Sequence, residues 1–175
     1  MPVTTTRTLP AAILREVQKA VIGKDLVLTK VLLAFLAGGH VLMEDMPGVG
    51  KTTLAMAFSK ALGLNCRRVQ FTPDVLPSDL TGFSVYEKNT GTFVFQPGAL
   101  FCHLLLADEI NRTSSKTQAA LLEAMEESNV TVEGKTYALP RPHLVIATQN
   151  PLGCVGTQSL PESQLCLLYT SPSPR

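Results

Sequence analysis

Hydrophobic and polar positions along the chain follow two different periods, and each period predicts a different kind of element. Short apolar runs, which are typical of buried parallel strands, occupy residues 40–44, 103–109 and 143–150, and "CRRVQF" (66–71) suits a further strand. Apolar positions at helical spacing occupy two segments within residues 9–37, separated by "VIGKD", and the segments 52–62 and 116–128. Because strands alternate with helices, the pattern predicts an α/β fold with three layers, in which helices cover a parallel central sheet.

Two further segments have the composition of β-hairpins. "FSVYEKNTGTFVF" (83–95) has β-rich arms around Asn89-Thr90-Gly91, and "VTVEGKTYAL" (130–139) turns at Glu133-Gly134. Prolines punctuate "TPDVLPSDLTG", which precedes the first of them, and there the sequence predicts a loop. We therefore expect two hairpin insertions in the α/β core.

Length and composition favour one well-buried globular domain. The chain has 175 residues, of which 45% are hydrophobic and 17% charged, and its formal net charge is +1. No apolar stretch reaches the roughly 18–20 residues that a membrane span needs, and the start lacks the apolar centre of a signal peptide. Basic residues cluster only at Arg67–Arg68. We expect a cytoplasmic protein with no membrane insertion and no nucleic-acid partner.

The cysteines and histidines give no sign of a metal site. Cys66, Cys102, Cys154 and Cys166 show no C-x-x-C spacing, so we expect reduced thiols. His40, His103 and His143 lie in or beside apolar runs, which favours structural roles for all three histidines.

The segment "EDMPGVGKTT" (44–53) lies between a predicted strand and a predicted helix. Gly48 and Gly50 allow the backbone N–H groups to point inward as an anion-binding nest, and the start of a helix adds partial positive charge. Lys51 would reach the β- and γ-phosphates, and the Thr52 hydroxyl would ligate Mg²⁺. Asp45 replaces the usual first glycine of the motif, a position that tolerates turn-forming residues. The sequence predicts a P-loop.

Polar side chains also follow two of the buried strands. Asp108 and Glu109 end the apolar run at 103–109, and Asn150 ends the last one. Since parallel strands meet at one edge with their carboxyl ends, these groups should converge near the P-loop. Asp108 would hold Mg²⁺ through its water shell, Glu109 would activate the attacking water, and Asn150 would orient that water or touch the γ-phosphate. Helix capping by the acidic pair is the alternative, but it leaves the preceding strand unexplained.

Four segments together resemble the MoxR family of AAA+ ATPases, in order and spacing, over roughly Val17 to Leu165. They are "GGHVLMEDMPGVGKTTLA", "VQFTPDVLPSDLTG", "LLLADEINRTSSKTQAALLEAMEE" and "LVIATQNP". The resemblance implies an ATP-driven chaperone or remodeller, usually a hexameric ring, that matures or activates partner proteins, often ones with von Willebrand A domains.

The resemblance also implies roles for individual residues. Lys51 and Thr52 match the Walker A motif, Asp108 and Glu109 match Walker B, and Asn150 matches sensor 1. The nucleotide-binding positions it implies are Val21, Ile22 and Gly23 beside the adenine, and Pro47, Gly48, Val49, Gly50, Lys51, Thr52 and Thr53 around the phosphates. The two hairpins are similar to elements that face the pore of the ring, although Tyr86 and Tyr137 could equally pack as ordinary strand aromatics.

Some features depart from the family pattern or leave another function open. "NPLGCVGTQSLPESQ" lacks the acidic residues expected around 153–155, which bears on contacts between subunits. The rival to an ATPase motor is a nucleotide-dependent binding module or switch with little hydrolysis. A GTPase switch would need D-x-x-G after the acidic strand, and "DEIN" has no glycine there.

The last ten residues, "CLLYTSPSPR", stand where the family continues with a helical lid. They match one reading frame of a transposase sequencing adapter. We expect residues 1–165 to be an incomplete AAA+ core without the lid, and residues 166–175 to be a non-native tail that Pro172 and Pro174 keep disordered. Such a fragment should bind ATP weakly and hydrolyse it at near-background rates.

Overall fold

The structure is a computed structural model, and it describes residues 8–44, 50–149 and 168–172. Its helices are α1 (Thr8–Gln18), α2 (Asp25–Leu36), α3 (Lys51–Leu62), α4 (Pro77–Thr81) and α5 (Ser115–Glu127), with a 3-10 turn, η1 (Ile110–Arg112). The strands are β1 (His40–Glu44), β2 (Cys66–Gln70), β3 (Phe83–Glu87), β4 (Thr92–Gln96), β5 (Leu104–Asp108), β6 (Asn129–Val132), β7 (Lys135–Ala138), β8 (Leu144–Gln149) and β9 (Leu168–Pro172).

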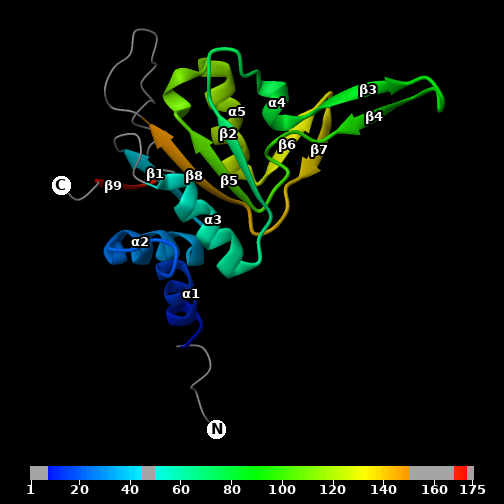
Figure 1. Cartoon of the computed structure of the whole chain (residues 1–175). Coiled ribbons are helices and arrows are strands. Elements are labelled where there is room, and N and C mark those ends of the chain that lie inside the picture. Colours follow the sequence, from blue (N-terminus) through cyan, green and yellow to red (C-terminus); the bar gives the residue numbers. More distant parts are fainter. Residues whose placement is uncertain (1–7, 45–49, 150–167, 173–175) are drawn as a thin grey trace.

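The central sheet has the order β2-β5-β8-β1-β9, and every neighbouring pair is parallel (Figure 1). The strands are not in chain order, so β8 lies between β5 and β1. The carboxyl ends of β1, β5 and β8 consequently meet at one edge of the sheet. The predicted parallel sheet is confirmed, and its order decides which polar groups become neighbours.

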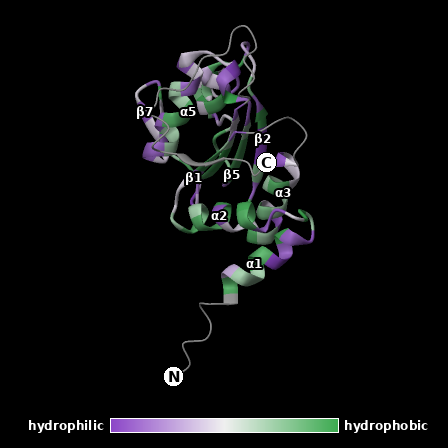
Figure 2. Cartoon of the chain, turned by 90° about the vertical axis from the view of Figure 1, so that its left-hand side faces the viewer, coloured by the Kyte–Doolittle hydropathy of each residue, from purple (hydrophilic) through white to green (hydrophobic). Residues whose placement is uncertain are grey.

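Helices cover both faces of this sheet, as predicted. Along β5, Leu104 and Leu106 pack with α1, α2 and α3, whereas Leu105 and Ala107 pack with α5 on the other face. Such alternation is the consequence of the two-residue period of a strand. Figure 2 shows α2, which lies over the first of these faces, as a largely hydrophobic helix. Among the described residues, no helix is both long and apolar enough to span a bilayer.

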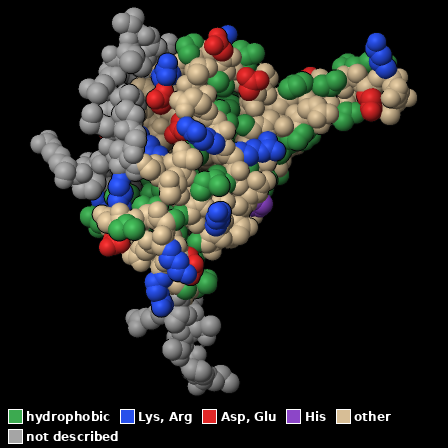
Figure 3. Space-filling view, in the orientation of Figure 1, with side chains coloured by type: hydrophobic (Ala, Val, Ile, Leu, Met, Phe, Trp, Pro, Cys, Tyr) green, Lys and Arg blue, Asp and Glu red, His purple; other side chains and the backbone are tan. Residues whose placement is uncertain are grey.

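The two predicted hairpins are present as β3–β4 and β6–β7. The β3–β4 hairpin extends away from the rest of the chain as an arm (Figure 1), and Figure 3 shows hydrophobic side chains along it. Tyr86 on this arm is half exposed. Tyr137 of β7 stacks on Phe95 of β4 with ring centroids 3.9 Å apart and packs against the core. Of the two tyrosines, Tyr137 thus packs as an ordinary strand aromatic, whereas Tyr86 stays half exposed on the arm.

The buried histidines join elements of the core, in line with the structural roles expected for them. Val145 N–H donates to His40 Nδ1 at 3.1 Å, so the ring proton lies on Nε2, which donates to Met125 O at 3.0 Å. His143 Nδ1 donates to Cys102 O at 3.0 Å. Cys66 and Cys102 are free thiols, and burial raises the pKa of Cys102 to about 11.

The loop predicted between β2 and β3 is wrong for residues 77–81, which form the short helix α4. Pro77 stands at its first turn, where a missing N–H costs nothing and the fixed φ favours a helix. Asp79 Oδ2 accepts a hydrogen bond from Leu76 N–H at 2.9 Å, and Leu80 is fully buried. Burial of Leu80 and this side-chain cap stabilise a helix that the prolines concealed.

The disorder predicted for residues 166–175 is wrong for residues 168–172, which form β9 parallel to β1. Without β9, β1 would be an open edge with unpaired backbone groups, and a segment that contains Leu168, Tyr169 and Thr170 has suitable strand propensity. Pro172 pairs with Glu44 at the end of this edge strand, where the sheet tolerates proline. Residues 166–167 and 173–175 lie outside the described part of the chain.

Candidate nucleotide-binding site

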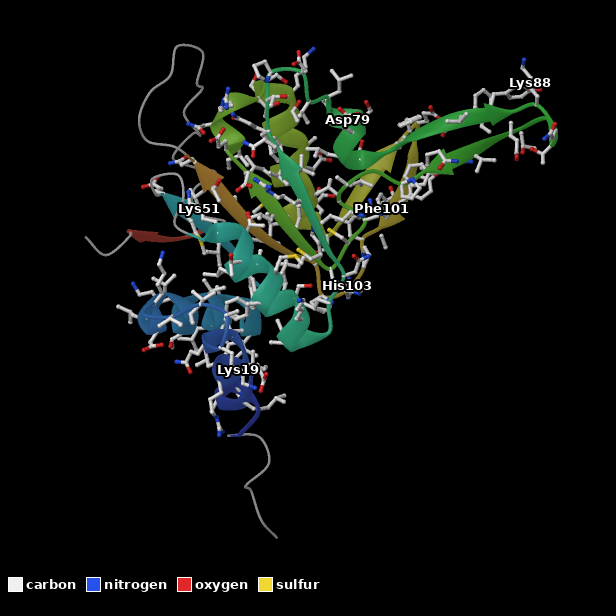
Figure 4. All side chains as sticks on the ribbon, in the orientation of Figure 1. Lys19, Lys51, Asp79, Lys88, Phe101 and His103 are labelled. Atoms are coloured by element: carbon white, nitrogen blue, oxygen red, sulfur yellow. The ribbon has the colours of Figure 1, made fainter. Side chains whose placement is uncertain are left out.

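Helix α3 begins beside the edge where β1, β5 and β8 end, and Figure 4 labels Lys51 at this end of the helix. Gly50 precedes the helix with φ 78° and ψ 24°, a left-handed conformation that favours glycine. Among the described residues no atom lies within 4 Å of a Cβ added at Gly50, and the backbone conformation by itself favours glycine there. The first turn contains Lys51, Thr52 and Thr53 and no acidic residue, so no carboxylate of the helix neutralises its positive end.

Asp108 ends β5 as a buried carboxylate, 7% exposed, with both oxygens engaged. Arg68 Nε of the neighbouring strand β2 donates to Asp108 Oδ2 at 2.7 Å. Thr148 Oγ1 of β8, on the other side, donates to Asp108 Oδ1 at 3.3 Å. An ionised carboxylate accepts in this way from both sides, which is the state that the predicted role beside Mg²⁺ requires.

Glu109 follows with φ 56° and ψ 50°, a left-handed conformation that costs a non-glycine residue of order 1–3 kcal/mol. Its N–H donates to Thr148 Oγ1 at 2.9 Å. Its carboxylate accepts from Arg112 Nη1 at 2.8 Å and from Gln70 Nε2 at 3.0 Å. The left-handed turn separates Glu109 from the extended path of β5, so the two adjacent acids have different partners. This separation is what two different roles would need.

The adenine-contact prediction concerns the turn between α1 and α2. Val21 is buried in the core with those helices, and Gly23 has φ 77°. Ile22 is 87% exposed, so its side chain is accessible to a ligand. Whether these residues contact a nucleotide stays a prediction. Four other predicted site residues lie outside the described residues, namely Pro47, Gly48, Val49 and Asn150, as does Asp45 of the predicted P-loop.

Sequence reasoning missed four residues that contact the acidic pair: Arg68, Gln70, Arg112 and Thr148. Arg68 and Gln70 are two residues apart on β2, and Gln70 is the register partner of Asp108. Two polar residues at positions i and i+2 of a predicted strand were a usable signal for this pair, because alternate side chains of a strand share a face. Thr148 offered the weaker signal of a hydroxyl in the run "VIATQN".

The donor set fits a nucleotide and Mg²⁺. A magnesium ion in a P-loop site takes few protein ligands, since phosphate oxygens and water complete its shell. The Thr52 hydroxyl and the Asp108 carboxylate are groups of that kind. No cluster of three or more His, Cys, Asp and Glu side chains that could hold a metal occurs within the described ranges, so a cage made of protein ligands alone is not indicated there.

Known proteins share this architecture and its sequence. The family model described as "ATPase family associated with various cellular activities (AAA)" matches residues 40–168. The uncharacterized protein YeaC of Bacillus subtilis is 53% identical, over 86% of this chain and 47% of its own length. Chaperone MoxR1 of Mycobacterium tuberculosis is 43% identical, over 90% of this chain and 41% of its own length.

A crystal structure of a Cytophaga hutchinsonii protein, described as a candidate ATPase, superimposes with a TM-score of 0.82 at 38% identity. The match covers 97% of this chain and 52% of that one. This chain spans less than half the length of the two curated relatives. The segment that the family model matches contains strands β1, β2, β5 and β8 of the sheet, together with α3 and the acidic pair. On this evidence the chain belongs to the MoxR family of AAA+ ATPases.

Proposed function

We propose that this protein binds and hydrolyses ATP with Mg²⁺ and uses the cycle to remodel partner proteins as a MoxR-type chaperone. One observation carries the proposal: the start of α3 and the acidic pair Asp108-Glu109 lie at the same edge of one parallel sheet. Ligands of α/β proteins bind beyond the carboxyl ends of the strands, and this edge offers both an anion-binding helix terminus and carboxylates.

Each group then has a separate role. Backbone N–H groups at the start of α3 and the Lys51 ammonium bind the phosphates, and Thr52 with Asp108 holds the cation. Bound Mg²⁺ neutralises charge on the phosphate oxygens. Glu109 accepts the proton of the attacking water, and Asn150 orients that water. Val21, Ile22 and Gly23 contact the adenine, with Pro47, Gly48, Val49 and Thr53 completing the nucleotide site.

A second state, in which nucleotide is bound with little hydrolysis, is favoured by the partners of Glu109. Its carboxylate accepts from both Arg112 and Gln70, and a general base must release such bonds before it can reach water. The geometry described above therefore supports binding more directly than turnover. For this chain we propose slow hydrolysis.

The relatives and the hairpin arm support a role in acting on other proteins. One relative is named a chaperone, Chaperone MoxR1. The arm exposes Phe83, Val85, Tyr86, Phe93 and Val94, the kind of surface that binds other proteins. We propose that the full-length protein forms a ring, as a hexamer, that works on client proteins in the cytoplasm, including clients with von Willebrand A domains. Sedimentation of the Glu109→Gln variant of the full-length protein with Mg·ATP tests assembly, and a monomer at micromolar concentration would contradict it.

The proposal also divides the chain into two parts. Residues 1–165 are the nucleotide-binding core, and residues 166–175 are a non-native tail. Resequencing the source locus across codon 165 tests this. An Asp-Arg-Phe continuation would support the proposal, and a native stop after "CLLYTSPSPR" would refute it.

Calorimetric titration of this chain with Mg·ATP tests the nucleotide site. Lys51→Ala should weaken binding by about tenfold or more, since it removes a charge that contacts the phosphates. Lys60→Ala is the matched control, because Lys60 lies in the last turn of the same helix, α3. Equal affinity in the unmodified chain and both variants would overturn the assignment.

A further inference from the structure

We propose that Thr148 is a positioning residue that holds both acids of the site through one hydroxyl group. Only the predicted effect of Thr148 on hydrolysis rests on the proposed function. The positioning role itself is argued from hydrogen bonds within the chain, without a nucleotide.

The Thr148 hydroxyl accepts one hydrogen bond and donates the other, and the first of these roles fixes the second. A hydroxyl has one proton and accepts through its lone pairs. Glu109 N–H can only donate, so Thr148 Oγ1 is the acceptor of that 2.9 Å bond. The single hydroxyl proton is then available for Asp108 Oδ1 at 3.3 Å. Both bonds form together, and the hydroxyl links the backbone of one acid to the side chain of the other.

The position of Thr148 in the sheet makes this arrangement stable. Strands β5 and β8 pair up to Ala107 and Ala147, so Thr148 stands one residue beyond, level with Asp108. Thr148 is 1% exposed, and water therefore does not compete for its hydroxyl. Arg68 occupies the other oxygen of Asp108, so rotation of the carboxylate would break bonds on both sides.

Thr148 also anchors the strained residue of the pair. Glu109 has φ 56°, a conformation that a non-glycine residue keeps only where its surroundings hold it. Its N–H bond to Thr148 is a direct restraint on that conformation. If the restraint were lost, Glu109 could relax toward an extended conformation. Its carboxylate would then leave the position, set by the left-handed turn, that keeps it apart from Asp108.

The test compares Thr148→Val, which keeps the shape but removes the hydroxyl, with Thr148→Ser, which keeps the hydroxyl. Thr117→Val is the matched control: Thr117 is also fully buried, and its hydroxyl donates to Val75 O at 2.9 Å with no bond to either acid. Thr148→Ala serves as a second variant if Thr148→Val does not fold.

The first readout is hydrogen exchange of the Glu109 amide, measured by NMR on the chain without nucleotide. Thr148→Val should speed exchange at Glu109 by about tenfold, the factor that one lost hydrogen bond gives. Thr148→Ser and Thr117→Val should leave that amide protected. Unchanged exchange at Glu109 in both Thr148→Val and Thr148→Ala would overturn the proposal.

The second readout separates positioning from folding and from the proposed function. In single-turnover hydrolysis by the full-length protein, with enzyme in excess, Thr148→Val should lower the rate constant about tenfold or more and leave the half-saturating ATP concentration within about twofold. Thr148→Ser should restore the rate. Equal rates in Thr148→Val and Thr117→Val would overturn the proposal. Failure of the unmodified full-length protein to bind Mg·ATP would instead refute the proposed function, and the amide exchange would still decide the role of Thr148.

Discussion

Arg68 of β2 donates from Nε to Asp108 Oδ2 of β5 across 2.7 Å, and the pair joins an exposed strand position to a buried carboxylate. The Arg68 side chain is 54% exposed and that of Asp108 only 10%. The guanidinium thus remains in contact with water while it satisfies a carboxylate that water reaches poorly.

A double-mutant cycle of Arg68→Ala and Asp108→Asn should measure this pair. We expect a coupling of about 1 kcal/mol in the free energy of unfolding, because solvent screens the exposed partner even though the acceptor is buried. Urea denaturation of the four proteins provides the measurement. Additive effects within about 0.3 kcal/mol would show that the pair contributes nothing.

Glu109→Gln should separate binding from turnover. The amide has nearly the shape of the carboxylate but cannot accept the proton, so in the full-length protein the single-turnover rate should fall by about 10²–10⁴-fold while ATP affinity changes little. Quenched-flow phosphate release together with calorimetry measures both quantities. Glu87→Gln on the hairpin arm is the control, since Glu87 lies in β3 away from the sheet edge. Undiminished hydrolysis would remove Glu109 from the role of base.

The stability of the chain should fall as the pH is lowered below the ordinary histidine value of 6.5. Burial lowers the pKa of His40 and of His143. Below pH 6.5 these histidines therefore bind more protons in the unfolded chain than in the folded chain. Stability is then complete above pH 6.5 and decreases toward the lowered folded values, by up to about 1.4 kcal/mol per pH unit for each histidine.

Denaturation between pH 7.5 and 5.5, above the range of most carboxylates, measures this slope. His40→Gln should reduce it, since it removes one of the two groups. A free energy of unfolding that stays constant across the interval would contradict the assignment of both rings as neutral.

Gly82→Ala should destabilise the base of the hairpin arm. Gly82 has φ 95°, and an added Cβ would collide with the carbonyl oxygen of Gln96 and lie 2.9 Å from Gly98 N. Strain and collision together should cost about 3 kcal/mol or more. Gly134→Ala is the control: φ is 75°, but no atom of the described residues lies within 4 Å of a Cβ there, so the conformational cost of about 1 kcal/mol is the expected effect. Equal shifts of the thermal midpoint would show that the close approach at Gly82 has no energetic effect.

Local pattern alone located the elements that carry the candidate site. The strand predicted at residues 40–44 has those bounds in β1. The helix predicted at 52–62 differs from α3 by one residue at its start, and the helix predicted at 116–128 differs from α5 by one residue at each end. Strand-forming residues on both sides of glycine-containing turns placed both hairpins, whereas the prolines before the first hairpin concealed α4. These features depend on neighbours within a few residues, which is the range over which a single sequence is informative.

Tertiary structure alone decided what surrounds the two acids. Arg68 and Thr148 are each 40 residues from Asp108 along the chain, and their local pattern marks them as polar strand residues without showing that Asp108 is their partner. They become its neighbours because the sheet order places β2 on one side of β5 and β8 on the other. Strand order follows from how helices on both faces bury apolar surface over the whole sheet, and a hydrogen bond made across strands exists only once that packing has formed.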